Sequence, residues 1–483
     1  MKPRQLAAYS KSLQTGNVID LARAKPDLLT KCIEQDGIDT RSAAVAGRRL
    51  VVAALENLPD FQISSILRLP APMRRLLLAV LEYESLVDPI VEITAAKLRQ
   101  ALLQHVLSRQ RVDGFAVDLI AALGIFSFNH EFILSESPNE SFQRGALDQT
   151  KPAHLAMSAA YKQLPVTDEA RDLLQTLRGQ HVNRLIQVQI DEPKQELDLR
   201  TSIPTLGNIK NTVSNAVREQ YEENPYPRWW RMTDLSLIEQ YGEKSILIAG
   251  CGTGWEALEI ALANESASVT ALDLSRSSLA FAQRQAIKYG AKNIKFFQGD
   301  ILELQAPPSF DVIVSSGVLH HMQKPLDGLC ALRQVLRDDG IIRLALYSET
   351  GRTPVIAGIA LRENLGLPPT PEGIRRLRDK IYQLPIDHPA RALLSWRDFY
   401  MLSECRDLVF NVQEHRYTLE QIGNLLRAGN FKFSEMITAP NVFDQFLNEF
   451  PNTSPDDLAT WKTFEDNHPG IFGSMFQFKA RPV

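Results

Sequence analysis

Cysteine is scarce in this chain of 483 residues. The four cysteines, Cys32, Cys251, Cys330 and Cys405, are far apart and form no C-x-x-C pair, and no cysteine and histidine cluster has the spacing of zinc ligands. A disulfide-framework domain and a zinc finger are therefore excluded. We expect reduced, mostly buried thiols and no metal site.

Long apolar runs and a strong net charge are also missing. The start, MKPRQLAAYSKSLQTG, lacks the apolar core of a signal peptide, and no run of 18 or more apolar residues follows. The formal net charge is only -4, which gives no global attraction to nucleic acid or to an anionic lipid surface. We therefore expect a cytoplasmic protein with no nucleic-acid partner and no membrane partner.

The composition that is present is that of an ordinary globular protein. With 44% hydrophobic and 23% charged residues, the length suggests about two to four domains. Between residues 42 and 190, apolar residues recur at helical spacing, as in RSAAVAGRRLVVAALENL and FAVDLIAALGIF, without a fixed repeat period. These patterns predict an all-α domain over residues 1–204. The proline-punctuated segment 190–212 is predicted to be a linker.

After residue 205 short apolar runs alternate with helical segments, which predicts a doubly wound α/β domain with a parallel sheet. The expected strands are KSILIAG, SVTALDLS, IKFFQGDIL, FDVIVSSGVL and GIIRLALYS. The expected helices are TGWEALEIALAN, RSSLAFAQRQAIKYG and PLDGLCALRQVLRDDG.

A glycine-rich turn, Gly250–Gly254, lies between the first of these strands and its helix. Glycines allow a tight turn and a close ligand, and the helix N-terminus offers unpaired N–H groups. The spacing G-x-G-x-G differs from the dinucleotide pattern G-x-G-x-x-G, so it favours a nucleoside ligand over a nicotinamide cofactor. Asp273 ends the second strand, where it can bind ribose hydroxyls, and Asp300 ends the third, within reach of an adenine amino group.

In this order the segments ILIAGCGTGWEALEIA, VTALDLS, FFQGDIL, FDVIVSSGVLHHM and LRDDGIIRLALYS resemble the class I S-adenosylmethionine-dependent methyltransferases. VREQYEENPYPRWW, SECRDLVFNVQEHRYTLEQIGNLL and WKTFEDNHPGIFGSMFQFKA resemble, more narrowly, a bacterial N-P-Y-P-R-W group that is often fused to tetratricopeptide repeats; such repeats are not recognisable here. The resemblance implies S-adenosyl-L-methionine as cofactor. The expected cofactor-binding residues are Gly250, Cys251, Gly252, Thr253, Gly254, Asp273, Leu274, Asp300, Ile301, Ser316, Gly317, Tyr221 and Arg228.

The resemblance also implies a seven-stranded fold and a division of the chain. NFKFSEMI and SMFQFKARP have the alternation expected of the sixth strand and an antiparallel seventh. The cofactor-binding core with an N-terminal lid is then expected at 205–349. A helical insertion over the active site is expected at 350–427, and the final strands at 428–483.

The stretch EENPYPRWW, residues 222–230, is open to more than one interpretation. As a lid, it has a proline-stiffened backbone, aromatic side chains near the sulfonium (Tyr221, Tyr226 and Trp229), and Arg228 to bind a carboxylate. As a structural clip, its tryptophans bury against the α-domain. The N-P-P-Y motif of methyltransferases acting on nucleic-acid bases has another residue order and another position, so we reject that equivalence.

Two further clusters carry polar side chains. Ser315–Met322 follows the fourth strand, and in the resembling family this segment lines the cleft beside the methyl group. There a neutral His320 or His321 is a candidate base for the acceptor's proton, with packing and helix capping as the alternative. The third cluster either faces a polar or amine-bearing acceptor or forms a structural network. It consists of Glu404, Cys405, Arg406, Asp407, Gln413, Glu414 and His415.

We thus predict an S-adenosylmethionine-dependent methyltransferase that acts on a protein side chain, because the helical domain and insertion offer more recognition surface than a metabolite needs. Glu222, Glu414 and Tyr226 suit a lysine amine, whereas a histidine base suits an enol or phenol. The alternatives are O- or C-methylation of a small molecule, and a non-catalytic scaffold. The helical domain is expected to bind the substrate, a partner protein or a second copy. The candidate catalytic residues are Tyr226, His320, His321 and Glu222.

Overall fold

The central sheet is built from short runs of Val, Ile, Leu and Ala, because strands that are covered on both faces must be apolar throughout. The computed structural model describes residues 2–15, 18–37, 39–58, 61–83, 88–108, 111–112, 114–207, 222, 228–232, 234–305, 307–411 and 413–483. Among these residues the sheet has eight strands in the order β3-β6-β5-β4-β7-β8-β10-β9. Their bounds are β3 (Thr205–Leu206), β4 (Ser245–Ala249), β5 (Ser268–Asp273), β6 (Ile294–Gly299), β7 (Phe310–Ser316), β8 (Leu336–Tyr347), β9 (Phe431–Met436) and β10 (Met475–Pro482).

The strands from β3 to β8 pair in parallel, and β10 lies antiparallel between β8 and β9. The antiparallel last strand agrees with the expectation, but the count of seven is wrong. The additional strand is β3, whose Thr205 pairs with Gln298 at the edge of β6. A strand edge exposes unpaired backbone N–H and C=O groups, and β3 provides hydrogen-bond partners for some of those on β6.

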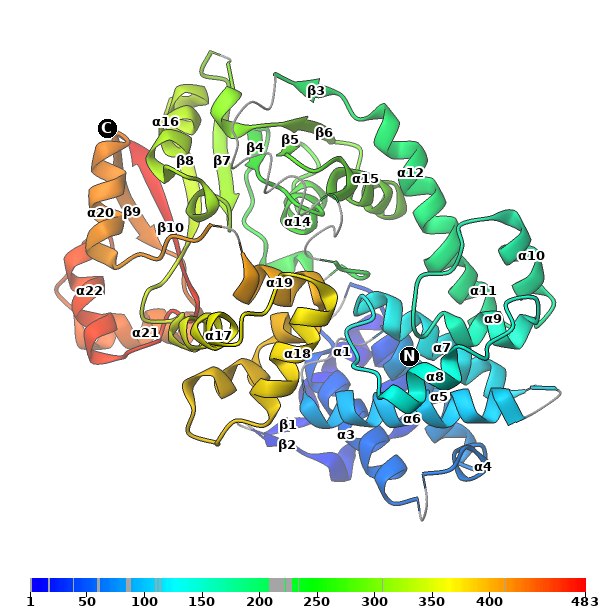
Figure 1. Ribbon diagram of the computed structural model, residues 1–483. Helices are drawn as coiled ribbons and strands as arrows, with labels where there is room; N and C mark the ends of the chain where they lie inside the picture. The colour runs from blue at the N-terminus through cyan, green and yellow to red at the C-terminus, as the bar shows by residue number, and fades with distance from the viewer. Residues whose placement is uncertain are drawn as a thin grey trace.

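Helices cover both faces of the sheet (Figure 1). Alternate residues of β4 point to opposite faces: Ile246 and Ile248 share a buried cluster with α14 and α15, while Leu247 and Ala249 share one with α16 and α20. Two further helices, α21 and α22, connect β9 to β10. The bounds are α14 (Trp255–Ala263), α15 (Arg276–Tyr289), α16 (Pro325–Val335), α20 (Leu419–Ala428), α21 (Pro440–Glu449) and α22 (Leu458–Asn467).

Two sequence-based boundaries are wrong. The helix expected to reach Gly340 ends at Val335, because Leu336 already pairs with Phe310 of β7. The predicted linker begins with a helix, α12 (Glu192–Ser202), which has Pro193 in its first turn, where proline fits. Arg284 of α15 pairs with two glutamates of α12, so this helix docks on the sheet domain.

A helical lobe, which we define as residues 2–190 and 353–410, lies beneath the carboxyl edge of the sheet (Figure 1). α7 is apolar almost all round and is correspondingly buried along nearly its whole length. The segment 2–190 is not purely helical, because β-branched Val18 and Ile19 pair with residues 14–15 as the short strands β2 and β1. The helices are α1 (Pro3–Ser12), α2 (Pro26–Glu34), α3 (Arg41–Glu56), α4 (Ile63–Ile66), α5 (Ala71–Tyr83), α6 (Pro89–Ser108), α7 (Phe115–Asn129), α8 (Pro138–Arg144), α9 (Pro152–Ser158), α10 (Asp168–Gln175), α11 (Gln180–Ile186), α17 (Thr353–Asn364), α18 (Pro371–Tyr382) and α19 (Leu402–Phe410).

The two parts of the helical lobe share one apolar core, which runs from Leu6 to Ile190 and includes Val355 to Phe410. A buried ion pair joins them: the Arg378 guanidinium of α18 lies 2.5 Å from the Glu92 carboxylate of α6. The Tyr382 hydroxyl donates a second hydrogen bond to Glu92, at 2.7 Å. The helical insertion is thus packed as part of the N-terminal helices, and only its last helix, α20, belongs to the sheet domain.

Within the described ranges, none of the helices combines the length and the apolar character needed to cross a membrane. The same ranges hold no group of three or more His, Cys, Asp or Glu side chains arranged to bind a metal ion.

Candidate active site

One pocket of about 450 Å³ lies at the carboxyl edge of the parallel strands, between the sheet and the helical lobe. Ligands bind at this edge in open α/β sheets, because the loops that leave the strands converge there. The pocket includes ten of the predicted site residues. They are Gly250, Cys251, Gly252, Asp273, Leu274, Asp300, Ile301, Ser316, Gly317 and His321.

The conformation of the glycine loop depends on its contacts with the neighbouring residues Val318 and Leu272. Gly250 has φ of +81°, and a Cβ there would lie 2.4 Å from Cγ2 of Val318. Gly250 and Cys251 both donate backbone hydrogen bonds to the Leu272 carbonyl. Burial raises the pKa of the Cys251 thiol well above its usual range, so the thiol is neutral in the pocket. The loop therefore presents backbone and a small neutral side chain to a ligand.

Asp273 connects the glycine loop to the end of β5. Its carboxylate accepts hydrogen bonds from the backbone N–H of Gly252 at 2.7 Å and of Ser275 at 2.9 Å. Burial nevertheless raises its pKa above the ordinary value, against the lowering effect of these bonds. Ribose hydroxyls that donate to the carboxylate would stabilise its charged form.

Asp300 has an unsatisfied oxygen inside the pocket. The residue is 3% exposed, and its Oδ1 accepts a hydrogen bond from the Leu302 backbone N–H at 3.0 Å. Its buried Oδ2 has no hydrogen-bond partner among the described residues. A buried carboxylate oxygen without a donor is costly, so this atom marks a place where a ligand donor belongs.

The two histidines after β7 are in different environments. His321 lines the pocket, and its Nδ1 lies 2.7 Å from the carbonyl oxygen of Gln413. Since a carbonyl only accepts, Nδ1 carries the hydrogen and Nε2 of the neutral ring is an acceptor. His321 therefore has the tautomer that a base requires.

His320 is fully buried and does not line the pocket. Its ring stacks on Tyr347 at 3.7 Å between centroids, and neither ring nitrogen has a partner among the described residues. Burial lowers its pKa well below the ordinary value, so the ring is neutral. The structure thus does not support His320 as a base, because it cannot reach an acceptor in the pocket.

The other predicted residues lie outside the pocket. Glu222 accepts hydrogen bonds from the backbone of Arg276 and Ser277 and pairs with Arg200, so it caps the N-terminus of α15 and does not guide an acceptor. Arg228 lies over the Phe128 and Phe281 rings and does not line the pocket. Tyr221 and Tyr226 lie outside the described residues.

Two residues of the glycine motif also lie behind the pocket. A Cβ at Gly254 would come 2.6 Å from the Ala282 Cβ, so this glycine permits close packing of α14 on α15. The buried Thr253 offers its carbonyl oxygen to the indole N–H of Trp229 at 3.0 Å. Trp230 instead donates to the Tyr83 carbonyl of the helical lobe, at 2.9 Å. These contacts fit the clip interpretation of the residues 228–230.

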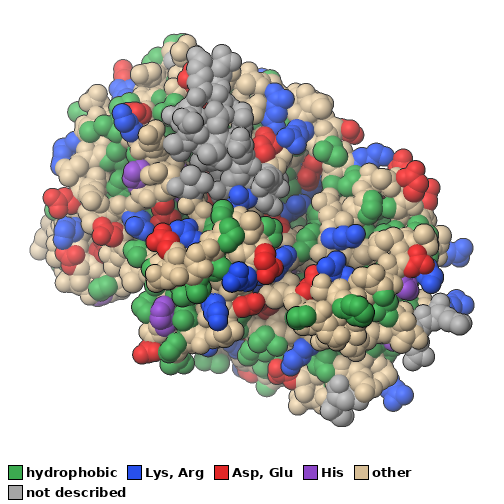
Figure 2. Space-filling model, in the orientation of Figure 1, with side chains coloured by type: hydrophobic (Ala, Val, Ile, Leu, Met, Phe, Trp, Pro, Cys, Tyr) green, Lys and Arg blue, Asp and Glu red, His purple; other side chains and the backbone are tan. Residues whose placement is uncertain are grey.

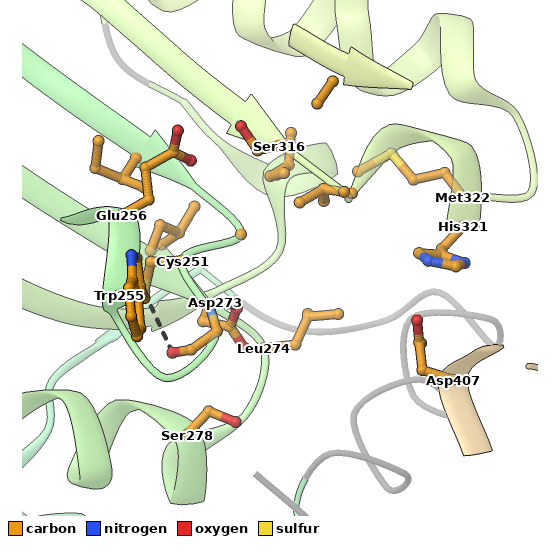
Figure 3. A pocket seen from close by; sticks show the side chains of 18 of the residues that line it. Cys251, Trp255, Glu256, Asp273, Leu274, Ser278, Ser316, His321, Met322 and Asp407 are labelled. Atoms are coloured by element: carbon orange, nitrogen blue, oxygen red, sulfur yellow. Dashed lines mark hydrogen bonds between the residues drawn. The ribbon is translucent and has the colours of Figure 1, made fainter. Parts of the chain in front are cut away.

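The far wall of the pocket combines Asp407 of the third polar cluster with two residues that the motifs did not identify, Tyr347 and Met475. Tyr347 ends β8, Asp407 lies on α19, and Met475 begins β10. Figure 3 shows Asp407 opposite His321, at the side of the pocket away from Trp255. Tyr347 could have been found by the rule that placed Asp273 and Asp300 at strand ends. Nothing in the sequence around Met475 indicates a pocket residue.

The third polar cluster divides in two. Asp407 reaches the pocket, whereas Glu414 is bound by the Arg352 guanidinium at 2.6 Å in a buried ion pair and does not guide an acceptor. Glu404 is 2% exposed, and its Oε2 lacks a partner among the described residues. Burial is the main cause that raises the pKa of Glu404 to about 8.

Residues 242–364 match the family model described as a methyltransferase domain. The chain contains a methyltransferase domain. S-adenosylmethionine is the cofactor that this match indicates, and the pocket residues fit it, because the unsatisfied Asp300 oxygen can accept an adenine amino hydrogen. Asp273 is placed to accept from ribose hydroxyls. The narrower resemblance to the N-P-Y-P-R-W group stays a prediction.

Three curated relatives are similar in sequence to parts of the chain. An uncharacterized protein of Synechococcus sp. is 31% identical over 256 residues, which are 47% of this chain and 60% of that protein. The release factor glutamine methyltransferase of Bacillus subtilis is 40% identical over 83 residues, 17% of this chain and 28% of that one. The ubiquinone biosynthesis O-methyltransferase of Paracidovorax citrulli is 25% identical over 159 residues, 32% of this chain and 64% of that one. The chain therefore spans less than two thirds of each of these relatives.

Proposed function

We propose that the protein is an S-adenosylmethionine-dependent methyltransferase whose acceptor is a protein side chain. The observation that carries the activity is the single pocket that holds the glycine loop, the two strand-end acids and His321. Binding groups and a candidate base thus lie within one ligand-sized cavity. The cofactor supplies a methyl group on a sulfonium when it is bound.

The residues of the chain then have separate tasks. Asp300 and Asp273 hold the adenosine, and the backbone of the glycine loop lies beside the methionine end. The sheet edge and the helical lobe exclude water from the reacting atoms, and alignment supplies most of the rate gain in such a displacement. His321 Nε2 takes the proton that the acceptor loses.

The helical lobe supports a protein acceptor. It supplies Asp407 to the pocket wall, so a surface much larger than the pocket is physically joined to the reacting site. On the visible face, acidic and basic side chains are interspersed over this lobe (Figure 2), which suits a mixed-charge protein surface. One relative, the release factor glutamine methyltransferase, is named for an amino acid side chain.

A small-molecule acceptor is the second candidate. Val318, Met322 and Met475 make part of the pocket lining apolar, as a site for a ring compound requires. The ubiquinone biosynthesis O-methyltransferase is a relative with such a name. A non-catalytic scaffold is the third candidate. Because both strand-end acids are present, such a scaffold would still bind the cofactor but would transfer no methyl group.

Calorimetric titration with S-adenosylmethionine and S-adenosylhomocysteine tests the cofactor site in the wild type and in Asp273→Ala. Transfer of a labelled methyl group into size-separated host lysate then tests the acceptor. We expect binding that Asp273→Ala weakens, and label in a protein band. Label only among small molecules would favour the second candidate, and binding without any transfer would favour the scaffold.

A further inference from the structure

His415 is bonded to the residues on both sides of His321. Its backbone N–H donates to the His320 carbonyl at 2.8 Å, and its ring nitrogen Nε2 lies 3.1 Å from the Met322 carbonyl oxygen. His415 belongs to the segment between α19 of the helical lobe and α20 of the sheet domain. A segment that joins the two parts of the molecule therefore holds the turn that carries the candidate base.

The Met322 carbonyl fixes the tautomer of the neutral His415 ring. A carbonyl oxygen only accepts, so Nε2 of His415 carries the hydrogen. The Gln413 side-chain amide lies 3.2 Å from the same nitrogen. An amide can present either its oxygen or its NH₂ group, whereas a carbonyl has no such choice, so the amide oxygen faces the ring. His321 instead carries its hydrogen on Nδ1, which donates to the Gln413 backbone carbonyl at 2.7 Å. The two histidines thus hold opposite tautomers.

The segment that carries His415 is anchored independently of the His415 ring. On one side, the Glu414 carboxylate pairs with the Arg352 guanidinium at 2.6 Å, and both side chains are buried. On the other side, the Tyr417 backbone N–H donates to the Tyr347 carbonyl at 2.9 Å. A change of the ring should therefore leave the path of the backbone in place and remove only one bond to the turn.

The position of His321 depends on this turn. Figure 3 shows His321 and Met322 next to each other at one side of the pocket, and both residues line it. They belong to η5 (Leu319–His321) and to the residue that follows it. The hydrogen bonds of a single 3₁₀ turn have poorer geometry than those of an α-helix, so contacts from outside add to its rigidity. A reacting group displaced by about 1 Å can cost about 100-fold in rate, so this rigidity matters for proton transfer.

We propose that His415 is a positioning residue for the base: its ring holds the turn after β7 so that Nε2 of His321 faces the acceptor. This inference rests on the proposed methyltransferase activity and adds to its site a residue that does not line the pocket. The acceptor's proton moves to Nε2 of His321. His415 keeps its own hydrogen throughout, because Nε2 of His415 donates to Met322.

The first test compares His415→Leu with His415→Gln and with a matched control, His154→Leu. His154 also bonds to the backbone, since its Nδ1 accepts from the Asp148 N–H at 3.1 Å, but it lies in the helical lobe and does not line the pocket. The full-length proteins receive saturating S-adenosylmethionine with a labelled methyl group and size-separated host lysate. The initial rate of label transfer measures turnover, and calorimetry with S-adenosylhomocysteine measures cofactor affinity.

We expect a rate about 5- to 30-fold lower in His415→Leu and a substantial recovery in His415→Gln, whose amide N–H can donate to the Met322 carbonyl. Affinity for S-adenosylhomocysteine, and the rate of His154→Leu, should stay within about twofold of wild type. An unimpaired His415→Leu would overturn the proposal, and so would a loss of cofactor affinity in that variant or a glutamine no better than leucine. Wild-type protein that binds the cofactor but transfers nothing would instead overturn the proposed function, and the positioning role with it.

A second measurement requires no methyl transfer. Nitrogen-15 labelling of histidine and long-range proton–nitrogen correlation, with S-adenosylhomocysteine present, show which ring nitrogen carries the hydrogen at a pH where ordinary histidines are neutral. Spectra of His321→Phe and His415→Leu assign the two sets of signals. We expect the hydrogen on Nδ1 of His321 and on Nε2 of His415, and a shift of the His321 signals toward a tautomer mixture in His415→Leu. The reverse tautomer at either residue, or unchanged His321 signals in His415→Leu, would contradict the proposed arrangement.

Discussion

The two ends of the pocket are built in different ways. At the end that we propose binds adenosine, Asp273 is the last residue of β5, Asp300 directly follows β6, and the glycine loop directly follows β4. At the acceptor end, His321, Tyr347, Asp407 and Met475 come from segments that are far apart in the chain, one of them in the helical lobe. The first end is fixed by strand order, whereas the second depends on how the lobe docks on the sheet.

The two ends should therefore tolerate substitutions differently. The proposed adenosine end would match a constant ligand, and parallel strands bring their carboxyl ends to one edge whatever the rest of the chain does. The acceptor end can change with the lobe that supplies it. Substitutions at the adenosine end should therefore alter cofactor affinity, and those at the acceptor end should alter turnover.

The largest effect is expected at the glycine loop. Gly250→Ala should destabilise the fold by about 2–5 kcal/mol, because left-handed backbone costs about 1–2 kcal/mol and overpacking against Val318 adds about 1–3. Gly290→Ala is the matched control: Gly290 has φ of +72°, and a Cβ there meets nothing within 4 Å. Urea unfolding of both variants measures the difference. Equal losses would show that the contact with Val318 has no energetic role.

The next effect separates the two histidines. His321→Phe should lower kcat by about 100-fold or more, since it removes the candidate base. His320→Phe should leave kcat nearly unchanged, because the buried ring does not line the pocket. Steady-state kinetics with S-adenosylhomocysteine affinity as a control gives the comparison. A larger loss of kcat in His320→Phe than in His321→Phe would contradict the assignment of His321 as the base.

At the adenosine end, Asp300→Asn should weaken S-adenosylmethionine binding by about 10- to 100-fold. The Leu302 N–H holds an oxygen at the Oδ1 position, so the amide NH₂ would stand at the Oδ2 position and oppose the adenine amino group. Calorimetry measures the change, with the exposed Asp338→Asn as control. Unchanged affinity in Asp300→Asn would remove the adenine contact from the proposal.

The smallest effect concerns Glu404, a buried carboxyl on α19 of the helical lobe. The pKa of Glu404 is raised to about 8 in the folded protein, so the native state binds an extra proton between the ordinary glutamate pKa and pH 8. Stability should therefore fall as pH rises through this window. Glu404→Gln should flatten the profile and raise stability at pH 9 by about 1–3 kcal/mol. The free energy of unfolding at pH 5 and pH 9 tests this prediction, and the exposed Glu420→Gln is the control. Parallel pH profiles of stability for wild type and Glu404→Gln would contradict it.

The EENPYPRWW stretch marks the limit of motif interpretation. Its two tryptophans donate to different parts of the molecule, Trp229 to the glycine loop and Trp230 to Tyr83 of the helical lobe. Composition alone could not separate this clip from a lid, because both need rigid backbone and aromatic surface. Likewise, the sequence gives no sign that Glu222 has partners. In the fold its carboxylate accepts hydrogen bonds from backbone N–H groups at the start of α15.

The parallel strands, the glycine loop and the two strand-end acids could be predicted from the sequence, because strand periodicity and strand-end position are local properties of the chain. The sequence did not determine which histidine reaches the pocket, since adjacent residues differ only in the direction of their side chains. The pairing of β3 with the edge of the sheet and the packing of the insertion on the N-terminal helices became clear only from the fold. The fold also brought Asp407 to His321, because such contacts depend on the packing of distant segments.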